Sequence, residues 1–246
     1  LTEDLILTKG LALPYDASLT MEGASLTVAG EDGYLYADGP IDLRGGVFTV
    51  RDEAVAAVSE LRDCGGLTVR NMGYLMLRSG LRPNDGAEIQ LSDARYLCGI
   101  GPLELHGVRV SVDGGLLRGT GRVELYGCTV DIGEQGGFLT SSSGLYFDPD
   151  TVITNNYGDL NFNGWDAQEF ACRLTNYGHL SMNNQVVISG TLVNEGHLTI
   201  WGGRDVLVRV SGSLENHGTV EFYQGGRFQP WAAGTVTGVP EQYVAD

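Results

Sequence analysis

Lysine is almost missing from this chain. Lys9 is the only one among 246 residues, and acidic residues outnumber basic ones by 31 to 15, so the formal net charge is −16. Such a surface repels phosphate backbones and anionic membrane surfaces, which makes nucleic acid and lipid surfaces unexpected partners. An isolated lysine near the start of the chain also argues against lysine-base or Schiff-base catalysis.

Other features that would announce a function are missing as well. No apolar run approaches the roughly 20 residues of a membrane-spanning helix, so no membrane insertion is expected. The sequence holds no nucleophile elbow, phosphate loop or His-Glu-x-x-His pattern. It therefore assigns no catalytic residue, no cofactor and no metal.

The cysteines also lack a recognisable arrangement. They are Cys64, Cys98, Cys128 and Cys172, and no two of them form a Cys-x-x-Cys pair, which argues against a zinc knuckle. We interpret them as free, buried thiols that pack as small hydrophobic side chains. Disulfides are the alternative in an exported protein, where four cysteines allow three pairings.

What the chain does contain is a repeat between Thr154 and Phe222. A phrase with asparagine two residues before a glycine occurs four times, and its glycines are Gly158, Gly178, Gly196 and Gly218. A period near 20 residues is typical of stacked repeats, in which each unit buries its apolar side only against its neighbours.

Each phrase predicts a bend followed by a short strand. The residues two and four places after each glycine are apolar and the residue between them is polar or small, as in Leu198, Thr199 and Ile200. Asparagine and glycine suit a bend, because glycine adopts positive φ at no steric cost. Stacking would place the asparagines above one another, which predicts a structural ladder of side-chain amides. Its members are Asn156, Asn176, Asn194 and Asn216.

A second repeat supports the same period. The segment 97–112 aligns with 117–132 at an offset of 20 without a gap, and Leu105 then corresponds to Leu125. Two separate stretches with one period indicate a solenoid that extends well beyond either of them.

The predicted fold is all-β: a single-stranded right-handed parallel β-helix with coils of about 20 residues, which forms one domain over residues 1–246. One short inserted helix is expected over 52–62, because Val55, Val58 and Leu61 recur at three-residue spacing among alanines. Residues 227–246 carry two prolines and no alternation, so we interpret them as a C-terminal cap or linker.

Four aromatic residues form a candidate ligand platform. Tyr157 and Tyr177 share the position before the repeat glycine, whereas Trp201 and Tyr223 share a position five residues after it. Exposed aromatic rings offer large rigid area to a sugar or a protein. The alternative is a purely structural ladder of rings that stabilises the stack.

Two clusters of ionisable residues are candidate metal sites. Glu104 and Glu124 would lie one coil apart, with Asp113 or Asp131 as helpers for calcium, but a solvated polar face is the preferred interpretation. His179 and His197 would stack in one row with Asp159, and this row lacks an apparent fourth ligand. We interpret it as a polar ladder.

The phrase in residues 192–200, Leu-x-Asn-x-Gly-x-Leu-x-Ile, resembles the coil of adhesin-like right-handed parallel β-helix proteins from bacterial surfaces. The architecture is also similar to the pectin-lyase-like superfamily of polysaccharide lyases and hydrolases. The hydrolase pattern is not matched, because no adjacent Asp-Asp and no Arg-x-Lys occur and each Gly-His is followed by leucine, as at Leu180 and Leu198.

The resemblance implies a non-catalytic, secreted or cell-surface domain that acts as a stalk or adhesin. Its expected partner is a host or environmental glycan or protein, and the fragment is expected to be monomeric. The alternative is a divergent carbohydrate-active enzyme, either a polysaccharide lyase or a glycoside hydrolase. A side groove with at least three carboxylates and an arginine would favour that enzyme.

Overall fold

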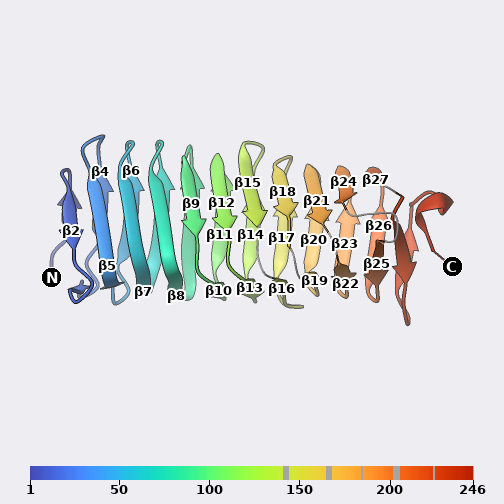
Figure 1. Cartoon of the computed structure of the whole chain (residues 1–246), viewed down its shortest axis with the longest axis horizontal. Coiled ribbons are helices and arrows are strands. Elements are labelled where there is room, and N and C mark those ends of the chain that lie inside the picture. Colours follow the sequence, from blue (N-terminus) through green and yellow to red (C-terminus); the bar gives the residue numbers. More distant parts are fainter. Residues whose placement is uncertain (141–143, 165–167, 184, 202–205, 224, 246) are drawn as a thin grey trace.

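The chain folds into an all-β parallel solenoid of about 11 turns of ~21 residues. The computed structural model describes residues 1–140, 144–164, 168–183, 185–201, 206–223 and 225–245. Successive coils lie side by side along one axis, with the N-terminal coil at one end of the rod and the C-terminal coil at the other (Figure 1). The predicted fold class is confirmed, and its right-handed winding stays a prediction.

Strands of successive coils pair in parallel and form three faces, which we call face I, face II and face III. Face I contains β1 (Leu5–Leu7), β4 (Leu26–Ala29), β6 (Val47–Arg51), β11 (Arg109–Asp113), β14 (Thr129–Ile132), β17 (Val152–Asn155), β20 (Arg173–Asn176), β23 (Thr191–Asn194), β26 (Ser213–Asn216) and β29 (Thr235–Thr237). Face II contains β2 (Leu11–Leu13), β9 (Tyr96–Gly99), β12 (Gly115–Gly119), β15 (Gly136–Thr140), β18 (Asp159–Phe162), β21 (His179–Asn183), β24 (His197–Trp201) and β27 (Thr219–Phe222). Face III contains β3 (Leu19–Thr20), β10 (Leu103–His106), β13 (Val123–Tyr126), β16 (Leu145–Phe147), β19 (Gln168–Phe170), β22 (Val186–Ile188), β25 (Leu207–Val210) and β28 (Arg227–Pro230).

Three long strands in the N-terminal half turn the corners between faces. They are β5 (Tyr34–Asp42), β7 (Val55–Arg70) and β8 (Tyr74–Ser92). The pairing of β7 with β8 shifts register after Val58 and again near Cys64. The chain therefore passes from one face to the next without leaving the ladder.

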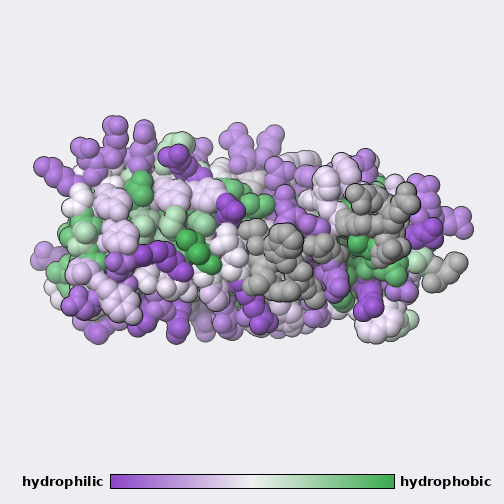
Figure 2. Space-filling model, viewed as in Figure 1, coloured by the Kyte–Doolittle hydropathy of each residue, from purple (hydrophilic) through white to green (hydrophobic). Residues whose placement is uncertain are grey.

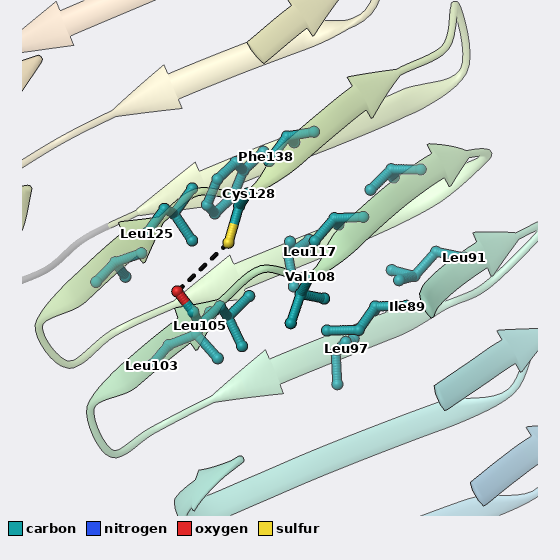
Figure 3. Close-up of a cluster of buried hydrophobic side chains, with 14 of the residues drawn as sticks. Ile89, Leu91, Leu97, Leu103, Leu105, Val108, Leu117, Leu125, Cys128 and Phe138 are labelled. Atoms are coloured by element: carbon teal, nitrogen blue, oxygen red, sulfur yellow. Dashed lines mark hydrogen bonds between the residues drawn. The ribbon is translucent and has the colours of Figure 1, made fainter. Parts of the chain in front are cut away.

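Aliphatic side chains fill the space between the faces. Inward positions alternate with outward ones along each strand, as the burial of Leu103 and Leu105 on β10 shows. In Figure 3, residues of β8, β9, β10 and β12 from adjacent coils meet in the core, and the buried Cys128 thiol donates a hydrogen bond to the Leu105 carbonyl oxygen at 3.3 Å. The rows continue from coil to coil, so the interior is one connected cluster.

The ungapped repeat is confirmed residue by residue. Leu97 pairs with Leu117, Leu105 with Leu125, and Val112 with Ile132. An offset of 20 residues is therefore one complete coil in this part of the chain.

The predicted helix over 52–62 is wrong, because this segment enters β7. Ala54, Ala56 and Val58 are completely buried and alternate with partly exposed residues, which is the period of a strand. The outward residues Val55 and Ala57 are apolar too, and this hides the alternation in the sequence. Only one short 3₁₀ helix, η1 (Glu241–Tyr243), occurs among the described residues.

The C-terminal segment 227–246 begins as part of the stack. β28 pairs with β25 and β29 pairs with β26, so the first half of this segment continues the sheets although its sequence lacks a clear alternation. Beyond β29 the chain turns over the end of the rod, where Tyr243 lies 5.5 Å from Phe222 between ring centroids. That contact fits the predicted cap, while Asp246 lies outside the described residues.

The repeat glycines are required by a close approach of neighbouring coils. None of Gly158, Gly178, Gly196 and Gly218 has positive φ, so the conformational reason inferred from the sequence is wrong. Instead, a Cβ atom on Gly196 would lie 2.2 Å from the carbonyl oxygen of Gly178. The glycines form a column in which backbone packs directly on backbone.

We predict that Gly196→Ala destabilises the fold by about 1–3 kcal/mol or more, because the coils must separate to admit the methyl group. The matched control is Gly80→Ala, since a Cβ there would meet nothing nearer than 3.6 Å. Thermal or urea unfolding of both variants tests this. Equal stability of the two would contradict the column of close contacts.

Candidate functional site

The buried asparagines form a continuous ladder along the corner between face I and face II. Asn155 Nδ2 donates to Asn176 Oδ1 at 2.6 Å, Asn176 Nδ2 to Asn194 Oδ1 at 2.7 Å, and Asn194 Nδ2 to Asn216 Oδ1 at 2.7 Å. Asn216 Nδ2 ends the row on the Gly238 carbonyl oxygen at 2.9 Å. The side-chain amides form their hydrogen bonds with one another, so the ladder holds the coils together and is not available to a ligand.

The predicted first member, Asn156, is wrong. It is exposed, and its neighbour Asn155 pairs with Asn176 in the ladder. The coil carries one extra residue between the ladder asparagine and Gly158, and Tyr157 accommodates it with φ of 66°. Asn155 Oδ1 is buried and has no hydrogen-bond partner among the described residues, because Ile132 occupies its position one coil earlier.

The four aromatic platform residues form two separate pairs. Tyr157 and Tyr177 lie before β18 and β21 with ring centroids 6.3 Å apart, and Tyr157 is 71% exposed. Trp201 and Tyr223 lie at the other end of the face II strands, where their rings stack with centroids 3.8 Å apart and 5° between the ring planes. A five-residue strand, roughly 13 Å long, separates the two ends, so they do not form one platform.

The histidine row is assembled as predicted from the sequence. Asp159, His179, His197 and Thr219 occupy one position in successive coils, and the imidazole rings stack at 5.3 Å. His179 Nδ1 lies 3.5 Å from Asp159, and His197 Nδ1 shares a 2.5 Å hydrogen bond with the Thr219 hydroxyl group. These contacts are those of a polar ladder along face II.

Glu104 and Glu124 pair one coil apart on face III, but each is engaged by its own strand neighbour. Glu104 accepts from His106 at 2.8 Å, and Glu124 accepts from Arg122 at 2.6 Å. Asp113 and Asp131 lie on face I, so they cannot complete a calcium site with these glutamates. Across the described residues, no group of three or more His, Cys, Asp or Glu side chains is placed to hold a metal ion.

A groove on face III is lined by several ionisable groups, and Glu104 is one of them. It measures about 520 Å³, and its lining includes Glu60, Arg82, Glu104 and His106. Glu60 already binds Arg82 at 2.9 Å and Arg62 at 2.5 Å. Two carboxylates, both in ion pairs, fall short of the three carboxylates with an arginine that would favour a carbohydrate-active enzyme.

A hollow on face II was missed by the sequence reasoning. Its lining includes Tyr74 and Tyr96, which stack at 5.8 Å, together with Arg95 and Arg118, and it encloses about 560 Å³. The available signal was the recurrence of tyrosine 22 residues apart in two alternating strands. Without the register of the coils, that spacing could not be matched to the arginines.

The cysteines are free and buried, as predicted. Burial raises the pKa of the Cys64 thiol to about 11 and that of the Cys172 thiol to about 12. The thiolate is the reactive form, so these side chains are inert packing groups near neutral pH.

Comparisons of the chain with protein-family models, with curated proteins and with solved structures found no match. Within the described residues, no helix has the length and apolar character to cross a membrane. The interpretation of the site therefore depends on the geometry of this chain alone.

We predict that Asn194→Ala lowers the free energy of unfolding by about 2–4 kcal/mol, because it removes the acceptor of Asn176 Nδ2 and leaves the buried Asn216 Oδ1 without its donor. Asn156→Ala is the control, since this exposed side chain lies outside the ladder and should change stability by less than about 0.5 kcal/mol. Urea unfolding measures both values. A larger loss for Asn156→Ala than for Asn194→Ala would contradict the ladder described above.

We also predict that a thiol reagent such as DTNB labels the folded protein very slowly at pH 8, because all four thiols are buried and burial raises the pKa of each. In denaturant all 4 cysteines should react promptly. Rapid labelling of the native chain would contradict the buried thiols, and fewer reactive thiols after unfolding would reveal a disulfide.

Proposed function

We propose that this chain is a non-catalytic β-helix domain, secreted or attached to a cell surface, that acts as a stalk or as an adhesive surface. One observation carries the proposal: the outward polar and aromatic groups that could do chemistry are paired along the rod. The stacked histidines and the stacked Trp201–Tyr223 pair follow this arrangement on the surface, and the buried asparagine ladder follows it in the interior.

The geometry suits a spacer. At about 4.8 Å per coil, 11 coils extend roughly 50 Å, and hydrogen bonds in every layer resist bending. The repeated phrase of residues 192–200 resembles the coils of bacterial adhesins, which supports the same role. Right-handed winding belongs to this proposal too.

A glycan is the proposed ligand of the adhesive surface. The Tyr157 ring is 71% exposed, and Trp201 and Tyr223 are 42% and 44% exposed, so each pair offers ring surface that a sugar could contact. Because the two pairs lie at opposite ends of the face II strands, we expect each to bind weakly and independently.

A glycan array and a polysaccharide-cleavage assay on the same preparation test the proposal. We predict no release of reducing ends or unsaturated products from any polysaccharide, and array signals that fall in Tyr157→Ala or in Trp201→Ala. Asn156→Ala, an exposed change beside Tyr157, is the control and should keep the signals. Product release would overturn the non-catalytic role, and array signals that survive both aromatic substitutions would overturn the glycan platform.

A further inference from the structure

Face II changes character along the rod. In the N-terminal half its outward rows are apolar: Tyr34, Val55, Tyr74, Tyr96 and Leu116 in one row, and Tyr36, Ala57, Met76 and Cys98 in the next. In the C-terminal half the same rows continue as Asp159, His179 and His197, and as Asn161, Ser181 and Thr199. Figure 2 shows pale and green surface over the N-terminal half of the rod, where β5, β7, β8 and β9 lie.

This apolar surface is partly open to solvent. Ile100, at the rim of the hollow, is 46% exposed, and Tyr34 is 40% exposed. A parallel sheet in contact with water normally presents polar outward residues, as the C-terminal half of the same face does. A contiguous exposed apolar surface instead indicates an interaction site.

The arginines of the hollow determine the charge of what binds there. Arg118 uses Nη1 to donate to the Tyr96 hydroxyl oxygen at 2.8 Å, and its buried Nε has no hydrogen-bond partner among the described residues. Arg78, at the edge of the same surface, is already paired with Asp38 at 2.6 Å. No carboxylate of the described chain pairs with Arg95 or Arg118, although acidic residues outnumber basic ones two to one. The hollow is therefore a cationic, apolar area on an acidic protein.

The size of the surface limits the occupant. From β5 to β15 it covers about five coil spacings and one strand length, roughly 300 Å². A stable protein dimer buries about 800 Å² on each partner, so this face alone is too small for a second copy of the rod. An extended peptide of seven or eight residues matches its length of roughly 24 Å.

We infer that the hollow of face II docks an extended acidic peptide that carries aromatic or aliphatic side chains. The apolar side chains pack on Tyr74, Met76 and Ile100, and a carboxylate binds the guanidinium groups of Arg118 and Arg95. Tyrosine and arginine are among the side chains that most often dominate such contacts, and a carboxylate forms charge-assisted hydrogen bonds with the terminal nitrogens of a guanidinium group. This inference rests on the adhesive half of the proposed function and names a different partner class at a different place on the rod.

Amide chemical shifts in ¹⁵N-labelled protein test the inference, with a blocked octapeptide of alternating aspartate and phenylalanine as the probe. We expect shifts confined to the part of face II that lies between residues 74 and 120, and saturable binding that weakens as salt is raised. The same peptide with asparagine in place of aspartate should bind about tenfold more weakly, since it loses the charge-assisted contacts.

Two variants locate the contact. Arg118→Gln keeps a donor for Tyr96 and should weaken peptide binding about tenfold. Ile100→Glu adds a like charge at an exposed position and should abolish binding without loss of thermal stability. Arg173→Gln on face I is the matched control and should bind within about twofold of the wild type.

The inference is overturned if the acidic peptide causes no shifts around the hollow, if the asparagine peptide binds equally well, or if Arg118→Gln binds like Arg173→Gln. It is also overturned if a glucuronate hexasaccharide shifts these amides and the peptide does not. Release of product from a polysaccharide would overturn the non-catalytic role while leaving the peptide site standing, so the two failures are distinguishable.

Discussion

Main-chain hydrogen bonding between parallel neighbours fixes every other feature of this molecule. It places each residue about 4.8 Å from its counterpart one coil away, so any property of a position is repeated as a row along the rod. Aliphatic rows become the core, asparagines become a chain of amide hydrogen bonds, and imidazole and indole rings become stacks. The glycine column marks where this spacing leaves no room for a side chain.

Rows have opposite consequences for stability and for chemistry. Identical side chains in a row satisfy one another, and this removes them from contact with a ligand. Catalysis requires different groups to converge on one point, and the described faces bring such groups together mainly in ion pairs such as Glu60 with Arg82. The hollow at Tyr74 and Tyr96 differs because Arg118 interrupts an apolar row, and an interrupted row leaves bonding capacity unused.

The fold could be predicted from the sequence wherever the repeat has no gap, as for Leu105 and Leu125. The predicted asparagine ladder was wrong by one residue at Asn155, because an extra residue at a corner does not change the inward pattern of the strands. The helix predicted over 52–62 was wrong because Val55 and Ala57 face an apolar outer surface, so both sides of that strand are hydrophobic in the sequence. The same apolar outer surface surrounds the hollow on face II. The residues that form the hollow lie one coil apart, so the site can be recognised only when the register of the coils is known.

The central claim is that positions one coil apart stack with a constant rise, and pulsed electron–electron spin resonance tests it most directly. Spin labels on outward-facing face I positions, with Arg109 as the common site and Thr191 or Thr235 as the second, span four and six coils of one ladder. The buried native thiols, protonated at labelling pH, leave the introduced cysteines as the reactive ones. The account predicts narrow distance distributions centred near roughly 19 and 29 Å before linker correction. Equal or broad distributions for the two pairs would contradict it.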